Sequence, residues 1–421
     1  MKTLYVDNYK GFKKTFIPFR DVNFFVGNNS TGKSAILNLL TLIMDQNFWN
    51  NPSFNTDVME MGYFDEIVNH YSSDKKYFSF AVEFCSVGGY DYYGMKFESK
   101  NNIPSLCEYV QTVNKKTLKV RFEKDKLYCQ VRDSANESFE DWISRIDDFG
   151  EKKELAGWGS TLNSVPLLTL IAIRGDEMLG QSDAKDFFMH NPMAYVLYDN
   201  YIGFAPIRAK VHRNYDAFRQ SFSAEGEHIP VKLRDIYTTT NSKKNAKIRS
   251  RLNRFGEVSG LFDKLDIMEF KHKSSSPYSI DVLYDKHRVN ITNVGYGVSQ
   301  VLPIVVEIVT NNGATFSIQQ PEVHLHPKAQ AEFGDLLFSS ATENKNRFIV
   351  ETHSDYTINR FRYRMKKSKK NISGQILFFE RDKEGIKVTP LPFCSNGKFE
   401  DELPNSYSDF FIDEEFKMLE F

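Results

Sequence analysis

The stretch "GNNSTGKS" at residues 27–34 fits the phosphate-loop pattern of nucleotide-binding proteins without a mismatch. An apolar segment, "VNFFV", precedes it, and a second apolar segment with helical character, "SAILNLLTLIMD", follows it. Glycines let backbone N–H groups turn toward phosphate oxygens, and the start of the helix adds a favourable dipole. The stretch therefore predicts a P-loop fold built from a strand, a glycine loop and a helix.

The predicted ligand of this loop is ATP with Mg²⁺. Lys33 is expected to reach the β- and γ-phosphates, and the Ser34 hydroxyl is expected to bind Mg²⁺. Including Ser299, introduced below, the predicted nucleotide-binding residues are Gly27, Asn28, Asn29, Ser30, Thr31, Gly32, Lys33, Ser34 and Ser299.

The second half of the chain alternates between strand and helix patterns. "ATFSIQ" is followed by the helical "KAQAEFGDLLFSSA", then by the strand "RFIVET" and the helical "YTINRFRYRMKK". This order predicts a parallel sheet. Because the phosphate loop lies near the N-terminus and these segments lie beyond residue 290, we expect an α/β head assembled from both ends of the chain.

Two motifs in this half follow the order of ABC-type ATPases. "NVGYGVSQVLPIVVEIV" at 293–309 is either an ordinary capped core helix or a signature helix that offers Ser299 in trans to the γ-phosphate bound by a partner subunit. Its place just before "FSIQQPE" favours the signature interpretation. "IVETHSD" at 349–355 then supplies His353 as a switch histidine that contacts the γ-phosphate.

The loop "QQPEVHLHP" has Gln319 and Gln320 where an ABC-type site has two acids. The first acid normally holds Mg²⁺ through water, and the second polarises the attacking water. Glutamine can orient water but cannot accept a proton, and loss of a general base costs about 10²–10⁴-fold in rate. Three explanations stay open: Glu322 or Glu351 supplies the carboxylate, the protein is an ATP-held clamp that hydrolyses slowly, or the acids were replaced deliberately.

The candidate catalytic residues are therefore Gln320, Glu322, Glu351 and His353, and the candidate Mg²⁺ ligands are Ser34 and Gln319. A transition-metal site made of Glu322, His324 and His326 is disfavoured, because a fourth ligand is missing nearby in the sequence.

The motifs together resemble a known family. "FFVGNNSTGKS", "GFAPIRA", "NVGYGVSQVLPIV", "QQPEVHLHPKAQAEF" and "IVETHSD" occur in the order seen in ABC-class ATPases related to RecF and to the OLD nucleases. The chain is most similar to a stand-alone branch found in bacterial defence islands, such as the ATPase subunits of Septu- and PARIS-like systems. The similarity covers most of the chain except about residues 100–195 and 215–275.

This resemblance implies a homodimer, or a higher homo-oligomer, that closes head to tail around ATP. It also implies a regulatory role in phage defence or DNA metabolism, often with a separate effector such as a nuclease or toxin. OLD nucleases carry a C-terminal Toprim domain, whereas only 66 residues follow "ETHSD" here, without an Asp-x-Asp motif. We therefore expect no intrinsic nuclease.

The fold class predicted from these features is an α/β P-loop NTPase of ABC type, with a mixed sheet flanked by helices and with inserted helical and β lobes. The predicted organisation is 1–95 as the N-terminal part of the ATPase lobe, 96–198 as an inserted lobe, 199–214 as a core strand, 215–276 as a basic helical insertion, 277–394 as the rest of the ATPase lobe and 395–421 as an acidic, aromatic tail.

Composition narrows the classes of partner. The net charge of −1 excludes a globally basic nucleic-acid coat, but "KKNAKIRSRLNR" is either a solvated helix face or a local DNA-binding surface. The four cysteines are scattered, so no disulfide framework is expected. No apolar run suits a signal peptide or a membrane span, which predicts a cytoplasmic protein without membrane contact.

Three functional classes remain at this stage. The first is an ATPase that senses or regulates within a defence system, and the second is a RecF-like ATPase that binds DNA. The third is a scaffold that binds ATP without turnover.

Overall fold

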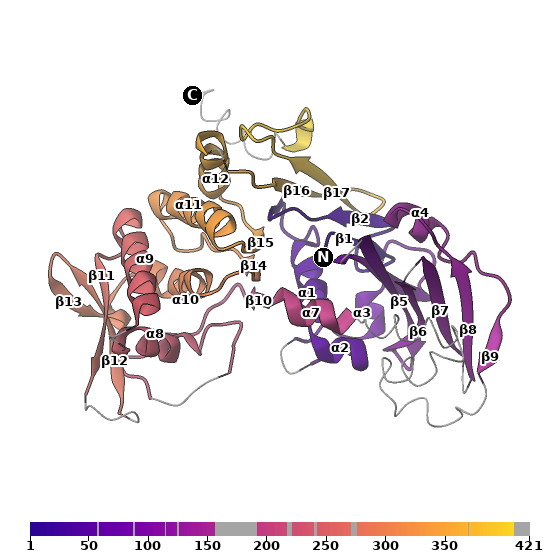
Figure 1. Cartoon of the computed structure of the whole chain (residues 1–421), viewed down its shortest axis with the longest axis horizontal. Helices are drawn as coiled ribbons and strands as arrows, with labels where there is room; N and C mark the ends of the chain where they lie inside the picture. The colour runs from indigo at the N-terminus through magenta and orange to yellow at the C-terminus, as the bar shows by residue number, and fades with distance from the viewer. Residues whose placement is uncertain are drawn as a thin grey trace. The chain divides into compact units, whose positions relative to one another are not determined.

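The computed structural model describes residues 1–56, 59–86, 89–113, 115–123, 126–155, 192–216, 221–239, 242–270, 276–368 and 370–407. Residues 156–191 of the predicted inserted lobe and the end of the predicted tail lie outside these residues. The chain divides into two compact units: unit 1 comprises Met1–Phe19, Asn28–Asp199 and Phe379–Thr389, and unit 2 comprises Arg20–Gly27, Asn200–Phe378 and Pro390–Phe421. Figure 1 labels their elements.

Unit 1 is built on an eight-stranded antiparallel sheet with the order β2-β1-β4-β5-β6-β7-β8-β9. Its strands are β1 (Thr3–Asp7), β2 (Thr15–Pro18), β4 (Tyr77–Ser86), β5 (Gly89–Lys100), β6 (Ile103–Val113), β7 (Lys116–Glu123), β8 (Lys126–Asp133) and β9 (Lys153–Leu155). The alternating stretch "YFSFAVEF" lies in β4, and β7 and β8 pair as antiparallel neighbours. The sheet runs without a break across the predicted lobe boundary at residue 95, which lies inside β5.

Short helices cover the sheet of unit 1, namely α1 (Lys33–Ile43), α2 (Gln46–Asn50), α3 (Phe64–Ile67), α4 (Phe139–Ser144) and α7 (Pro192–Asp199). Aromatic side chains fill the contacts. Phe48 of α2 lies 6.0 Å from Phe80 of β4 between ring centroids, and Phe78 and Phe97 stack at 5.2 Å. These large rings account for much of the apolar area that unit 1 buries.

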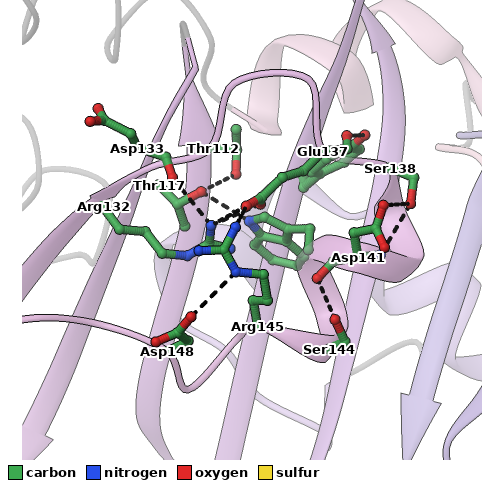
Figure 2. A network of polar contacts seen from close by, with 12 residues as sticks. Thr112, Thr117, Arg132, Asp133, Glu137, Ser138, Asp141, Ser144, Arg145 and Asp148 are labelled. Carbon is green, nitrogen blue, oxygen red and sulfur yellow. Dashed lines mark hydrogen bonds and ion pairs between the residues drawn. The ribbon is translucent and has the colours of Figure 1, made fainter.

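Helix α4 is fastened to the sheet by the polar network in Figure 2. Arg132 of β8 donates from Nη1 to both carboxylate oxygens of Glu137, at 2.6 and 2.8 Å, and Arg145 pairs with the same carboxylate. Trp142 of α4 is fully buried, and its indole donates to Thr117 at 3.0 Å. Because buried polar groups cost free energy unless they are paired, these bonds hold α4 in one position.

A second sheet has six strands in the order β10-β14-β15-β3-β16-β17; β10, β14, β15 and β3 lie in unit 2, and the unit boundaries fall within β16 and β17. The strands are β3 (Val22–Gly27), β10 (Tyr201–Phe204), β14 (Thr315–Gln319), β15 (Arg347–Glu351), β16 (Gly374–Arg381) and β17 (Ile386–Pro392). Strands β10, β14, β15 and β3 are parallel to their neighbours. The predicted parallel order of the second half is confirmed, and β3 joins it from the N-terminal part of the chain, whereas β1, β2, β4 and β5 belong to the eight-stranded sheet.

Three longer helices pack on this sheet: α10 (Tyr296–Thr310), α11 (Pro327–Glu343) and α12 (Asp355–Lys367). Phe316 of β14 stacks on Phe348 of β15 at 5.4 Å, and Phe24 of β3 meets Phe361 of α12 at 5.4 Å. Burial of one phenylalanine side chain stabilises the fold by about 1.5–3 kcal/mol relative to leaving it exposed to water. The apolar strands predicted from the sequence therefore form the core.

The rest of unit 2 is a three-stranded antiparallel sheet with helices beside it. Its elements are α8 (Ile229–Thr238), α9 (Lys243–Ser259), β11 (Lys264–Glu269), β12 (Tyr278–Tyr284), β13 (His287–Asn290) and the 3₁₀ turn η2 (Ile291–Asn293). The predicted basic helix is confirmed as α9, which begins after the Ser242 cap and ends at Gly260 with φ 75°. Among the described residues, no helix combines the length and apolarity needed to cross a membrane.

Candidate nucleotide-binding and hydrolysis site

The phosphate loop has the predicted local structure. Strand β3 ends at Gly27, and α1 begins at Lys33. Ser30 and Gly32 both have positive φ, 62° and 82°. A Cβ at Gly32 would lie 2.6 Å from the ring of Phe12 and 2.8 Å from Ile386, so only glycine fits this turn without displacement of its neighbours.

The charges of the loop suit a phosphate. Lys33 is 3% exposed, and its ammonium donates to the Asn28 carbonyl at 2.8 Å, which holds the charge over the loop. Thr31 donates to the same carbonyl at 2.7 Å. The first turn of α1 contains no acid, so its N-terminal N–H groups and the charge of Lys33 suit an anion. Ser34 follows directly as the expected Mg²⁺ ligand.

The strands that carry the other motifs end at one edge of the unit 2 sheet. Strands β14, β15 and β3 are adjacent and parallel, so the ends of all three point the same way. The backbone N–H of Thr352, just after β15, donates to Phe25 of β3 at 3.1 Å. Gly27, Gln319 and Glu351 therefore end neighbouring strands at the edge where α/β sheets bind ligands.

Gln319 and Gln320 form a sharp corner at the end of β14. Gln320 has a φ of 45°, and its N–H donates to the Glu351 carbonyl at 2.8 Å. Both glutamines are half-buried. Glu351 itself is buried at 5% exposure.

Glu322 connects the loop after β14 with the loop after β15. One carboxylate oxygen accepts a hydrogen bond of 2.7 Å from the backbone N–H of His353, and the other accepts one of 2.8 Å from the Thr352 hydroxyl. The structure therefore brings two of the predicted site residues, Glu322 and His353, into direct contact.

Arg208 is a charged residue of this region to which the sequence reasoning gave no role. It follows β10, because the core strand predicted at 199–214 spans only Tyr201–Phe204. The side chain donates from Nη2 to the Gln319 carbonyl at 2.7 Å and from Nη1 to the Pro206 carbonyl at 2.6 Å. Burial lowers the pKa of the Arg208 guanidinium to about 10, and the negative charge of Glu322 opposes that shift. A single arginine between apolar residues was the available sequence signal.

The predicted signature helix is α10. Ser299 is 6% exposed, and its hydroxyl donates to the Tyr296 carbonyl at 2.9 Å within the same helix. The exposed residues at the helix start are Gly295 and Tyr296, the latter at 68% exposure. A Cβ at Gly297 would lie 2.6 Å from the His324 carbonyl, so the helix start packs tightly on the loop that contains Glu322.

The two histidines of this loop have structural contacts. His326 caps α11 by accepting a hydrogen bond of 3.3 Å at Nδ1 from the N–H of Ala329. The ring of His324 lies 5.6 Å from the ring of Tyr296. Within the part of the chain that the structure describes, no group of three or more His, Cys, Asp or Glu side chains is arranged to hold a metal ion.

Comparison with known proteins identifies one family. The family model described as an AAA ATPase domain matches residues 1–156 and 207–358, well over half of the chain. No curated protein matches.

The solved structures similar to this chain include heads of Smc proteins. The Smc head bound to the C-winged helix domain of ScpA has 14% identity and a TM-score of 0.48, covering 93% of this chain and 97% of that one. The Thermotoga maritima SMC head domain has 12% identity and a TM-score of 0.39, with 93% and 98% covered. The Pyrococcus furiosus Smc head domain with an extended coiled coil, bound to the C-terminal domain of ScpA, has 12% identity and a TM-score of 0.40, with 100% and 98% covered.

Proposed function

Since this chain belongs to the AAA ATPase domain family, we propose that it binds ATP with Mg²⁺ at residues 27–34, dimerises around the nucleotide and hydrolyses it slowly. The observation that carries the proposal is the geometry of the phosphate loop. Gly32 makes the turn that no other residue fits, and the Lys33 ammonium lies over the loop.

Each residue has a defined task in this proposal. Lys33 and the start of α1 bind the phosphates, and Ser34 holds Mg²⁺. Gln319 supports the Mg²⁺ shell, Gln320 orients the attacking water, and His353 contacts the γ-phosphate. Because neither glutamine accepts a proton, electrostatic stabilisation by Lys33 and Mg²⁺ provides most of the acceleration. Mg²⁺ would supply Lewis-acid stabilisation of the phosphoryl oxygens.

The dimer is proposed to use the start of α10. Gly295 and Tyr296 expose the positive end of a 15-residue helix, which suits the γ-phosphate held by a second copy. Ser299 is the proposed hydroxyl of this contact, and its bond to Tyr296 would have to be exchanged for one to the phosphate.

Gly295→Arg tests the dimer. A Cβ at Gly295 meets no atom within 4 Å, and its φ of −60° suits any residue, so an arginine is tolerated in the monomer. We expect this variant to bind ATP but to stay monomeric in light scattering with a non-hydrolysable ATP analogue. Gly150→Arg, also in open space, is the matched control and should still dimerise. An unchanged dimer in Gly295→Arg would reject the proposed contact.

The physiological role that we propose is regulation of a separate effector protein in anti-phage defence. The support for this part is the order of the five motifs and their resemblance to the defence-island branch. The test is a plaque assay in cells that carry the gene with its genomic neighbours. Lys33→Ala should abolish protection against phage although the variant protein is still produced. Equal protection by the wild type and by Lys33→Ala would argue against this role.

Nucleic-acid binding is the second candidate, favoured by the surface of α9. Lys243, Lys244, Lys247 and Arg254 are exposed, and helical spacing places them on one side, opposite the buried Leu252. The first acid of the helix is Glu257, near its end. Such a stripe attracts phosphates through charge alone, and it lacks the aromatic side chains that stack on single strands, so duplex DNA is the favoured ligand.

A further inference from the structure

Two long-range contacts meet at the corner formed by Gln319 and Gln320. From one side, Arg208 holds the Gln319 carbonyl at 2.7 Å, although 111 positions separate them. On the other side, Glu322 binds the backbone of His353. Arg208 and Glu322 thus hold residues at the two ends of one short segment, 319–322.

We infer that Arg208 and Glu322 form a positioning pair that sets the Gln319–Gln320 corner against His353, and that Glu322 is not the general base of hydrolysis. The inference rests on the ATPase function proposed above and assigns roles within the same site. It removes Glu322 from the candidate general bases by giving it a task other than proton transfer.

The hydrogen bonds around Glu322 leave it oriented toward protein groups. The Thr352 hydroxyl is fully buried and accepts a bond of 3.0 Å from the Ser354 N–H, so its own proton is directed to Glu322. Ser354 in turn donates to Gln330 of α11 at 2.6 Å. The carboxylate is thus one end of a satisfied network that links the loop after β14 to the starts of two helices.

Arg208 is the other anchor of this region. The side chain is 5% exposed, and its guanidinium donates to two neutral carbonyls. Its bond to the Gln319 carbonyl and the bonds of Glu322 hold the same short segment, residues 319–322, from two sides. Loss of either anchor loosens the segment that the other one holds, so the two residues should be energetically coupled.

Positioning matters for the rate of hydrolysis in a site that has no acids at positions 319 and 320. A glutamine accelerates hydrolysis only by holding water in the attacking position, and a misplacement of about 1 Å can cost about 10²-fold in rate. Gln320 also has a positive φ, which surrounding contacts must maintain. The anchors on the Gln319 carbonyl and the His353 N–H hold the two loops that carry Gln320 and His353.

The decisive comparison is Glu322→Gln against Glu322→Ala. Glutamine can still accept from the His353 N–H through its oxygen and donate to the Thr352 hydroxyl through its nitrogen, whereas alanine can do neither. A positioning role predicts that Glu322→Ala lowers kcat about 10- to 100-fold more than Glu322→Gln, with little change in KM for ATP. The acidic limb of the kcat–pH profile should be the same in Glu322→Gln as in the wild type.

A general-base role predicts a different result, because neither substitution could accept a proton. Equal losses in Glu322→Gln and Glu322→Ala, of about 10²-fold or more, would overturn the inference. So would the disappearance of the acidic limb in Glu322→Gln alone.

Arg208 is tested by the same logic. Arg208→Met should lower kcat, Arg208→Lys should recover part of the loss, and Arg208→Met with Glu322→Gln should lose less than the two single changes multiplied together. Losses that multiply without coupling would reject the pair.

A measurement that does not depend on ATP turnover distinguishes failure of this inference from failure of the proposed function. Thermal unfolding without nucleotide should show the same non-additivity between Arg208→Met and Glu322→Gln. If the wild type showed no ATP turnover, the proposed hydrolysis would fail, while coupled melting shifts would still support the pair. Additive melting shifts would overturn it even in an active enzyme.

Discussion

The carboxylate of Glu322 accepts a hydrogen bond of 2.7 Å from the backbone N–H of His353, across 31 positions of sequence. The first residue follows β14 and the second follows β15, which are parallel neighbours in the sheet. The contact ties the two loops that carry the predicted hydrolytic residues. The contact concerns how these loops are held in place, as distinct from the chemistry of their single side chains.

Lys33→Ala should weaken ATP binding about 10- to 100-fold. The lost charge-assisted hydrogen bond to phosphate is worth about 1.5–3 kcal/mol, and each 1.4 kcal/mol corresponds to a tenfold change in affinity. Titration with a fluorescent ATP analogue measures this change. The exposed Lys264→Ala serves as a control of equal charge and should bind normally. Normal binding by Lys33→Ala would place the nucleotide elsewhere.

Gly32→Ala should destabilise the protein and impair ATP binding. A residue with a Cβ at the observed φ of 82° is strained by about 1–2 kcal/mol, and the Phe12 ring would have to move as well. Chemical denaturation and ATP titration report the two effects separately. Gly150→Ala, whose Cβ meets open space, should alter neither. Wild-type stability in Gly32→Ala would show that the loop adapts to the methyl group.

Gln319→Asp combined with Gln320→Glu should raise ATP turnover. A carboxylate at the water position can accept a proton, which contributes about 10²–10⁴-fold in other enzymes. The observed φ of 45° at Gln320 is no more strained for glutamate than for glutamine, so the corner should be kept. The rate of phosphate release measures the gain in turnover. The same variant with Lys33→Ala added gives the background rate. Turnover that falls on restoring the acids would mean that the glutamines are the working residues.

Replacement of three cations of α9 should weaken DNA binding and its salt dependence. Lys243→Gln, Lys247→Gln and Arg254→Gln together remove up to three phosphate contacts, which lowers the slope of log K against log salt by up to about 3. Fluorescence anisotropy with duplex DNA at several salt concentrations gives this slope.

The matched control for the DNA prediction replaces three exposed lysines of unit 1, Lys75, Lys76 and Lys100, with glutamine. It removes the same charge and should leave the slope unchanged. Equal reductions in both triple variants would attribute binding to overall charge and not to α9.

Ionisation of Glu307 on α10 should make the free energy of unfolding depend on pH in the acidic range. Burial alone would raise the pKa of this carboxyl, but the hydrogen bond from His228 and the charge of Lys232 outweigh it and lower the pKa. A carboxyl whose pKa is lower in the folded state stabilises the protein at pH values above its unfolded-state pKa, near 4.5. This contribution is lost as the pH falls through the folded-state pKa.

The measurement is the free energy of unfolding from neutral pH to well below pH 4.5, since the contribution is lost below the unfolded value. The wild type should lose stability more steeply on acidification than Glu307→Gln, which starts lower and depends less on pH. Glu343→Gln, at an exposed carboxylate, should follow the wild type. Parallel curves for the wild type and Glu307→Gln would remove Glu307 from the acid response.

Local patterns determined a large part of this protein from the sequence by itself. The phosphate loop at 27–34, the strand and helix order from 314 to 367 and the basic helix α9 all depend on residues within a few positions of one another. Periodicity, glycine positions and charge runs therefore predict them. Only the tertiary structure gave Arg208 its contact with Gln319 and gave Glu322 its contact with His353. Those contacts follow from which strands are neighbours in the sheet, and the spacing of residues along the chain does not encode that order.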